Sequence, residues 1–232
     1  MALPVAHYPL NLAYGAHEKY GKQPSGVIHG SVTPAPGPHN EPDGAYEFPG
    51  TSDSYIEFPN DGGLDTRFSI TLMCWVQPGG QDGPLFNYRE SGPWGVHIWI
   101  NFKKFFNRIT VRDTHAFRTA ISSFEELAEG QWYHVAATYD HNTGVNSLFI
   151  NGHPDNSLFI NTSYEISTND NKVRMGVKAG DGRYFKGKIA EMKVYDFALN
   201  ADQIQAAMNA EGSLRIFSLS FVHREPSHPF RT

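Results

Sequence analysis

Hydrophobic and polar residues alternate through the middle of the chain, most clearly between residues 130 and 152. Residues 132–139 alternate with a period of two and are rich in aromatic and β-branched side chains, which is typical of a β-strand. Residues 140–144 contain Asn and Gly, which tolerate positive φ, so we expect the chain to turn there and return along residues 147–151. Asn151-Gly152 is a strong hairpin signal, and residues 157–161 repeat the letters of residues 147–151. We therefore predict two successive hairpins within a larger sheet, because one hairpin alone is marginally stable.

Short extended segments of this kind recur about every 8–12 residues, which is typical of a β-sandwich or jelly roll. A helix is expected at residues 200–209, where Asn200 is the N-cap and Gln203 completes a capping box. The predicted fold class is all-β: an antiparallel β-sandwich with one short C-terminal helix, as a single domain over residues 1–222 and a flexible tail at 223–232. The main further strands are expected at residues 46–48, 55–58, 68–76, 85–89, 95–101, 107–112, 173–177, 187–195 and 213–222.

The composition narrows the classes of function. The 232 residues carry a formal net charge of -5, which argues against nucleic acid as the main partner. The single cysteine, Cys74, excludes an intrachain disulfide, and its position in an apolar strand predicts that it is buried. No apolar run approaches the ~20 residues of a membrane helix, so we expect no membrane insertion. No secretion signal is visible at the N-terminus, so the protein is either cytoplasmic or has lost such a signal.

A series of motifs then appears in a recognisable order. They lie at residues 8–11, 46–48, 55–56, 68–78, 130–136, 148–152, 185–195 and 197–204. In this order the chain resembles the laminin-G-like jelly rolls of the concanavalin A-like lectin/glucanase superfamily, and the resemblance covers about residues 8 to 208. Relatives usually have Asp where this chain has Ala190, and often Asp where it has Asn11. Those positions are linked to calcium or to polar packing in relatives, so the resemblance does not support a calcium ion of the family type here.

The fold that the chain resembles has one concave sheet open to solvent. Alternation along residues 95–101 and 107–112 predicts that one set of side chains faces outward together. An indole stacks on the apolar face of a sugar, while imidazole, amide and guanidinium groups pair with its hydroxyls or with a carboxylate. Loops next to these strands add further candidates. The loop at residues 181–184, which precedes a strand that matches the family, is a separate candidate for the border of a site, and a plain turn is the favoured alternative for it. The predicted ligand-binding residues are His97, Trp99, Asn101, Arg108, Arg112, Tyr88, His115 and Arg183, with Trp94 beside them.

An alternative stays open for these residues. A long loop over residues 113–130 would cover Trp99, and the arginines would pair with Asp113 or Glu125. Residues 60–65 are rich in oxygen ligands, so Asp61 and Asp65 are weak candidates for binding calcium, although turn chemistry explains them equally well. No cofactor is required.

The catalytic signature of glucanases with this architecture is absent. That signature is the pattern Glu-x-Asp-x-x-Glu on one strand, which places two carboxylates across the sugar-binding cleft. The acidic pair Glu125-Glu126 does not replace it, because we expect these two residues on a loop where their side chains diverge. We therefore predict a non-catalytic carbohydrate-binding protein, a lectin or glycan-adhesion module, rather than an enzyme. The arginines favour an acidic or sulfated sugar, while a neutral hexose remains open. A protein-binding or structural adhesion module is the alternative, and a glycoside hydrolase is a weaker one. We expect an extracellular location and self-association through the strand at residues 213–222.

Overall fold

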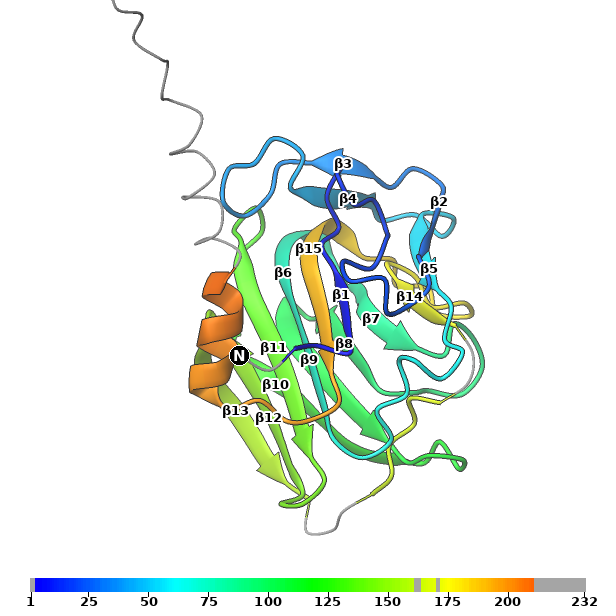
Figure 1. The fold of residues 1–232 in the computed structure, drawn as a ribbon, viewed down its shortest axis with the longest axis vertical. Helices are drawn as coiled ribbons and strands as arrows, with labels where there is room; N and C mark the ends of the chain where they lie inside the picture. Colours follow the sequence, from blue (N-terminus) through cyan, green and yellow to red (C-terminus); the bar gives the residue numbers. More distant parts are fainter. Residues whose placement is uncertain (1–2, 161–163, 170–171, 211–232) are drawn as a thin grey trace, which may run out of the picture.

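The computed structural model describes residues 3–160, 164–169 and 172–210, and these residues form two antiparallel β-sheets packed against each other (Figure 1). One sheet has eight strands in the order β13-β12-β11-β6-β15-β4-β3, with β1 also paired to β15. The other has seven strands in the order β10-β9-β8-β7-β14-β5-β2. A short helix at residues 201–210 follows the last strand. The predicted fold class, an antiparallel β-sandwich with one short C-terminal helix, is confirmed.

The strands have the following bounds. The eight-stranded sheet contains β1 (Ala6–Tyr8), β3 (Thr33–Ala35), β4 (Ala45–Pro49), β6 (Ile70–Gln81), β11 (Tyr133–Asp140), β12 (Val145–Ile150), β13 (His153–Phe159) and β15 (Lys186–Tyr195). The seven-stranded sheet contains β2 (Val27–His29), β5 (Tyr55–Phe58), β7 (Gly83–Tyr88), β8 (His97–Asn101), β9 (Lys104–Thr110), β10 (Phe117–Glu126) and β14 (Val173–Met175).

The two predicted hairpins are confirmed, and they form one edge of the larger sheet. β11 pairs with β12, and β12 pairs with β13, so that Ser147 faces Ser157 in the repeated segment. The turn between β12 and β13 consists of Asn151 and Gly152, with φ of 51° and 80°. Two consecutive left-handed residues define the turn that matches the twist of paired strands, and Asn and Gly adopt it at the lowest cost. The sequence of this turn therefore fixes the register of the hairpin.

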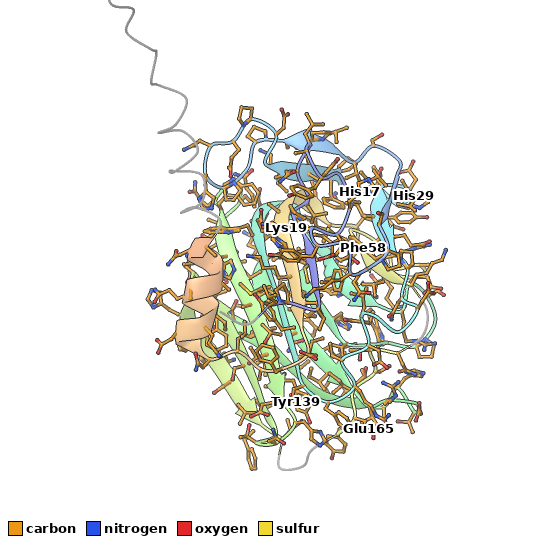
Figure 2. All side chains as sticks on the ribbon, viewed as in Figure 1. His17, Lys19, His29, Phe58, Tyr139 and Glu165 are labelled. Atoms are coloured by element: carbon orange, nitrogen blue, oxygen red, sulfur yellow. The ribbon has the colours of Figure 1, made fainter. Side chains whose placement is uncertain are left out.

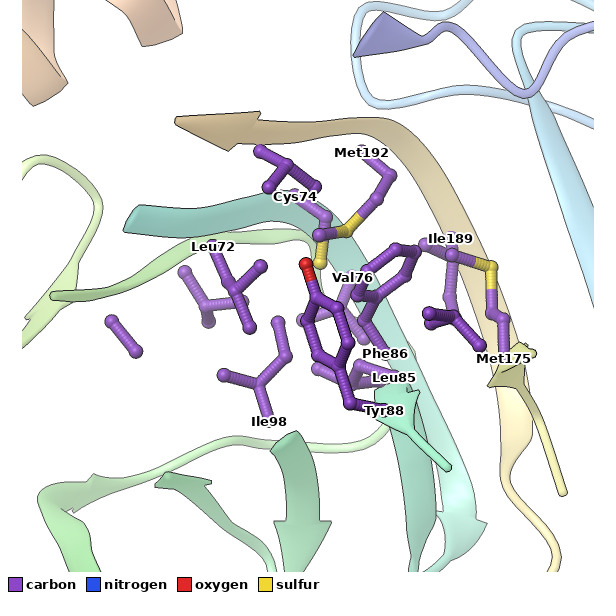
Figure 3. Close-up of a cluster of buried hydrophobic side chains, with 14 of the residues drawn as sticks. Leu72, Cys74, Val76, Leu85, Phe86, Tyr88, Ile98, Met175, Ile189 and Met192 are labelled. Carbon is purple, nitrogen blue, oxygen red and sulfur yellow. The ribbon is translucent and has the colours of Figure 1, made fainter. Parts of the chain in front are cut away.

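The core lies between the two sheets, and β6 runs through the middle of the larger one. Cys74 is fully buried there, as predicted, among the cluster of aliphatic, aromatic and methionine side chains drawn in Figure 3. Burial raises the pKa of its thiol well above the ordinary value, so this cysteine stays protonated. Phe58, labelled in Figure 2, packs between Tyr8 and Phe86 with ring centroids 4.4 and 5.6 Å away. Ile98 of β8 and Ile109 of β9 belong to the same core cluster, so the inward side of these two strands packs against the other sheet.

The helix at residues 201–210 covers part of the outer face of the larger sheet. The predicted capping box is present: the backbone N–H of Gln203 donates to Asn200 Oδ1, and the Asn200 N–H donates to Gln203 Oε1, both at 2.9 Å. Ile204 and Ala207 pack with Met73 and Phe149 of the sheet in a second apolar cluster. Within the described residues, no helix is long and apolar enough to cross a membrane.

The expected long loop at residues 113–130 is wrong, because residues 117–126 form the edge strand β10. Asp113 and His115 adopt left-handed φ of 63° and 52°, and the Val111 N–H donates to the Ala116 carbonyl at 2.9 Å, which reverses the chain within a few residues. β10 then pairs with β9, with Ala120 opposite Arg108. Glu125-Glu126 accordingly lies at the end of a strand rather than on a loop. The strand predicted at residues 213–222 and the tail at 223–232 lie outside the described residues.

Candidate functional site

Polar and charged side chains lie in register across the outer face of the seven-stranded sheet. Glu57 of β5 faces Arg174 of β14, Arg174 faces Asn87 of β7, Asn87 faces His97 of β8, and His97 faces Arg108 of β9. Their immediate neighbours in each strand are buried between the sheets, nearly all of them in the apolar core, so strand alternation turns this row outward. The exception in chemistry is Asn107, which is buried beside Arg108 and donates to Asn146 Oδ1 of the other sheet. Glu57 and Arg174 form an ion pair of 2.8 Å, which satisfies the near end of the row. The far end, at His97 and Arg108, opens into a recess.

This recess, which we call the Trp99 pocket, is small. Its volume is about 80 Å³. A water molecule occupies about 30 Å³ of liquid, so the pocket has room for a substituent of a few heavy atoms and not for a whole sugar ring. The pocket is lined by Trp94, His97, Trp99, Asn101, Phe106, Arg108 and Arg183. The structure thus brings together five of the eight predicted ligand-binding residues.

The indole of Trp99 supports this pocket from beneath instead of facing solvent. Trp99 is only 1% exposed, because the ring of Trp94 covers it at 5.5 Å and the guanidinium of Arg183 lies 4.5 Å from its centroid. Its Nε1–H donates to Asn87 Oδ1 at 3.0 Å. The prediction of an open indole for stacking was therefore wrong, since strand alternation shows which face a residue takes and not what the neighbouring loops place over it.

His97 is a neutral hydrogen-bonding group. It is 1% exposed, and its Nδ1 lies 2.9 Å from the carbonyl oxygen of Gly95, which can only accept, so Nδ1 carries the proton. Burial, together with the nearby charge of Arg108, lowers the pKa of the ring to about 3. The second ring nitrogen, Nε2, therefore carries a lone pair and can accept a hydrogen bond from a hydroxyl.

Arg108 is held by aromatic rings. Its guanidinium carbon lies 5.0 Å from the ring centroid of Trp94 and 5.6 Å from those of Phe106 and Phe117. The Nε of Arg108 is buried without a hydrogen-bond partner. At the other end of the same row, Arg174 is paired with Glu57. Burial and the neighbouring Arg183 lower the pKa of the Arg108 guanidinium, which shows the cost of keeping it charged in this place.

Arg183 joins the Trp99 pocket to a larger recess. It donates to both carboxylate oxygens of Asp181, at 2.9 and 2.7 Å, and to Asn101 Oδ1 at 3.1 Å. On its other side lies a cleft of about 450 Å³, which we call the Phe102 cleft. This volume is within the range of about 300–1,000 Å³ that is usual for ligand sites. The side chains that line the cleft include Gln81, Asp82, Phe102, Lys103, Arg183 and Tyr184.

The Phe102 cleft is bordered by an unusual turn. Phe102 and Lys103 form the two-residue connection between β8 and β9, with φ of 52° and 62°. Two left-handed residues in succession favour Asn and Gly, and other side chains adopt this region at a cost. The Phe102 ring is 79% exposed, while its backbone N–H donates to Asp82 Oδ2 at 2.7 Å. A strained turn that holds a large apolar ring in water is the kind of feature that functional sites retain.

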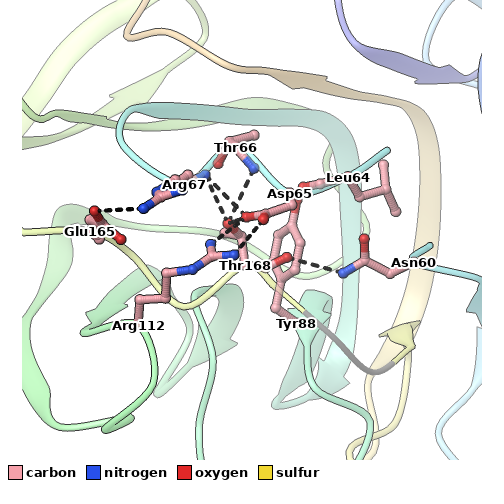
Figure 4. Close-up of polar contacts among 9 residues, drawn as sticks. All are labelled: Asn60, Leu64, Asp65, Thr66, Arg67, Tyr88, Arg112, Glu165 and Thr168. Atoms are coloured by element: carbon pink, nitrogen blue, oxygen red, sulfur yellow. Dashed lines mark hydrogen bonds and ion pairs between the residues drawn. The ribbon is translucent and has the colours of Figure 1, made fainter. Parts of the chain in front are cut away.

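Three predicted residues lie away from the Trp99 pocket. Tyr88 is buried in the core and donates its hydroxyl to the Leu64 carbonyl at 2.7 Å, because it sits on the inward side of β7. Arg112 forms a bidentate ion pair with Asp65, at 2.8 and 2.7 Å, and not with Asp113 or Glu125 (Figure 4). His115 Nδ1 lies 2.8 Å from Ser167 Oγ on the turn after β9. The prediction that Tyr88 faces a ligand was therefore wrong, because its side chain is buried. Arg112 and His115 lie outside the Trp99 pocket.

The two candidate calcium ligands, Asp61 and Asp65, have different surroundings. Asp65 accepts hydrogen bonds from Arg112, Thr168 and the Arg67 backbone, as Figure 4 shows. Burial alone raises the pKa of Asp65, but these hydrogen bonds outweigh it and lower the pKa below the ordinary value. A guanidinium thus occupies the position of a cation beside Asp65, and Asp61 is exposed. Over the described ranges, no group of three or more His, Cys, Asp or Glu side chains is placed to hold a metal ion.

A larger recess lies elsewhere and has different chemistry. It has a volume of about 790 Å³ and is bordered by Phe124, Val145, Phe149 and Leu199 on the outer face of the larger sheet. Among the described residues that line it there is no tryptophan, histidine, lysine or arginine. One of its acids, Asp155, accepts from the backbone N–H groups of residues 124 and 125 and is therefore already satisfied. Size alone does not make it the better candidate for a polar ligand.

The chain belongs to the concanavalin A-like lectin/glucanases superfamily. The family model Laminin_G_3 of that superfamily matches residues 49–205, in agreement with the resemblance in the sequence motifs. No curated protein matches the chain.

Solved structures share the fold at low sequence identity. The binding domain of Paraclostridial Mosquitocidal Protein 1 has a TM-score of 0.71 at 14% identity, covering 90% of this chain and 52% of that one. The binding domain of botulinum neurotoxin serotype G has a TM-score of 0.69 at 14% identity, covering 90% and 51%. This chain therefore spans about half the length of these two. Domain 4 of AbnA, an extracellular arabinanase from Geobacillus stearothermophilus, in complex with arabinotriose, has a TM-score of 0.66 at 21% identity, covering 89% and 98%.

Proposed function

We propose that this protein is a non-catalytic carbohydrate-binding protein, a lectin or glycan-adhesion module, whose ligand occupies the Phe102 cleft and the adjoining Trp99 pocket. The observation that carries the proposal is the position of Arg183, which borders both recesses. On one side of it are an exposed phenylalanine and a tyrosine, which suit the apolar face of a sugar. On the other side are amide, imidazole and guanidinium groups, which suit its polar substituents.

The relatives are compatible with a binding role. The superfamily name includes lectins, two similar structures are binding domains of larger proteins, and the third is a domain of an arabinanase in complex with arabinotriose. That arabinanase is extracellular, which is consistent with a secreted location for this protein. Roles in cell adhesion and self-association remain part of the proposal.

The carboxylates of the site favour binding over hydrolysis. Glycosidases need two carboxyl groups on either side of the bond, one of them with a raised pKa. Asp181 instead has a lowered pKa, because Arg183 donates hydrogen bonds to it. Asp82 accepts a hydrogen bond from the backbone of the Phe102 turn. Both carboxylates therefore serve to position other groups, and we expect no release of reducing ends from any glycan that binds.

A glycan array tests this proposal. The wild-type protein is compared with Phe102→Ala, which removes an exposed ring from the cleft, and with Phe159→Ala as a matched control. Phe159 is 62% exposed on β13 of the other sheet. We expect glycan binding to be weakened at least about fivefold in Phe102→Ala and to be unchanged in Phe159→Ala. Equal binding by both variants would reject the Phe102 cleft as the site.

A protein-binding adhesion module is the second candidate. It is favoured by the recess on the larger sheet, where Phe124 is 73% exposed beside Phe149 and Leu199. Capture of a protein partner that is abolished by Phe124→Ser and unaffected by glycans would favour this alternative.

A further inference from the structure

Arg108 lacks a carboxylate partner of the kind that three other arginines of the described residues have. Arg174 pairs with Glu57 at 2.8 Å, Arg112 pairs with Asp65 at 2.7 Å, and Arg183 pairs with Asp181 at 2.7 Å. For Arg108, the described residues provide aromatic rings and no carboxylate, and its Nε is buried without a hydrogen bond.

Resting on the proposed sugar-binding function, we infer that the ligand carries an anionic substituent, a carboxylate or a sulfate ester, and that Arg108 binds this group in the Trp99 pocket.

The charge around the pocket supports an anion. Lys178 lies beside Trp94, with its Nζ 4.7 Å from the ring centroid, and donates to the Gly92 carbonyl at 2.9 Å. It is 4% exposed. The nearby carboxylate of Asp181 has both oxygens on Arg183. Asp181 and Glu90 interact favourably with the Lys178 ammonium, while Arg89 repels it. The cations Arg89, Arg108, Lys178 and Arg183 outnumber these two carboxylates, so the charge beside the aromatic wall is positive, in a place partly removed from water where electrostatic attraction is strong.

The position of Arg108 also destabilises the free protein. A partly buried guanidinium without a counter-ion is unfavourable, and contacts with aromatic faces return only part of the lost hydration. The lowered pKa of Arg108 has this cause. An anion that binds to Arg108 removes this destabilisation, and the free energy recovered contributes to the affinity, as at other preorganised sites.

The Trp99 pocket also has the size of an anionic substituent. About 80 Å³ accommodates a carboxylate or sulfate group, and the sugar ring itself then lies outside it. The Phe102 cleft, which shares Arg183 with the pocket, provides about 450 Å³ for the ring and its neighbours. The neutral His97 accepts a hydroxyl hydrogen beside the anion, so it aids orientation without adding charge.

Calorimetric titration with matched sugars tests the inference. The panel pairs oligosaccharides of a neutral hexose with those of the corresponding uronic acid and with their sulfate esters, and inorganic sulfate alone serves as a probe. We expect the acidic member to bind about ten- to a hundredfold more tightly than the neutral one at low salt, as for a charge-assisted hydrogen bond, with the difference shrinking at high salt. The uronate and sulfate arms show which anion is preferred.

Two variants complete the experiment. Arg108→Gln removes an unpaired charge, so it should fold, and it should bind the acidic and neutral members equally; Arg108→Lys should retain part of the preference. Arg67→Gln is the control, because Arg67 is an exposed arginine paired with Glu165, 3.0 Å away, and outside the site. An unchanged acidic preference in Arg108→Gln would overturn the inference. If the wild-type protein binds acidic and neutral sugars equally well, and Phe102→Ala weakens both, the inference about the anionic group is overturned and the proposed function stands. If the wild-type protein binds no sugar, both the inference and the proposed function are rejected.

Discussion

Replacing the Phe102-Lys103 turn by Asn-Gly should stabilise the protein and weaken ligand binding. Both residues have left-handed φ, 52° and 62°, which costs a residue with a Cβ roughly 1–2 kcal/mol. Asn tolerates this region and Gly has no such penalty, although a new glycine costs up to about 1 kcal/mol through the greater entropy of the unfolded chain. The lost Phe102 side chain is 79% exposed, so little packing is lost with it. The net expected gain is about 1–2 kcal/mol, or about 2–8 °C in Tm for a domain of this size.

Chemical denaturation followed by tryptophan fluorescence measures this free energy, and titration with a glycan found on the array measures the affinity. We expect affinity to fall at least about fivefold, which corresponds to the loss of about 1 kcal/mol from one aromatic contact. The variants Phe102→Asn and Lys103→Gly, made separately, show which position stores the strain. The turn at Asn151-Gly152 is the internal control, since it already has the favoured residues at φ of 51° and 80°. A double variant that is no more stable than wild type would refute the strain argument.

Further predictions concern Trp99, two buried histidines and the Asp65 ion pair. Trp99→Ala should cost about 3–5 kcal/mol in unfolding free energy, because the indole is 1% exposed; a loss below about 1 kcal/mol would contradict its supporting role. The pKa values of His97 and His134 are lowered to about 3, so their neutral forms contribute stability that is complete above the ordinary pKa of about 6.5 and is lost as pH falls toward 3. His97→Gln should therefore reduce the slope of stability against pH in that window by about one proton, and an unchanged slope would show that His97 titrates normally. The pKa of Asp65 is also lowered, so its ion pair contributes above the ordinary pKa of about 3.9 and is lost at more acidic pH; Asp65→Asn should flatten acid denaturation there, and equal acid sensitivity would argue against the pair.

Local sequence rules predicted the fold well because its registers are set locally. The hairpins of β11, β12 and β13 follow from period-two alternation and from turn residues, as at Asn151-Gly152. The helix start follows from Asn200 and Gln203, which satisfy each other's backbone. β10 was missed because it is an edge strand with a partly polar, exposed sequence that also suits a loop.

The site was predicted only in part, for physical reasons. Alternation along β8 and β9 correctly grouped His97, Trp99 and Arg108 in one pocket, because neighbouring strands stay in register. It could not show that Trp94 and Arg183 cover the indole, since both come from outside those strands. The pairing of Arg112 with Asp65 joins residues 47 positions apart, which no local pattern indicates.

Phe102 and Lys103 were absent from the predicted ligand-binding residues, and Tyr184 was included only as part of the candidate loop at residues 181–184. Phe-Lys is not a turn signal, so the two-residue turn between β8 and β9 could be found only from the backbone. The one indication in the sequence is that neither Asn nor Gly stands at the two positions where β8 must reverse into β9.

A crystal structure of the protein with the tightest-binding acidic oligosaccharide would show where the ligand lies. We expect a sugar ring against Phe102 in the cleft of about 450 Å³, with its carboxylate or sulfate within hydrogen-bond distance of Arg108. A sugar bound instead in the recess between Phe124 and Leu199, with both proposed recesses holding only water, would contradict it.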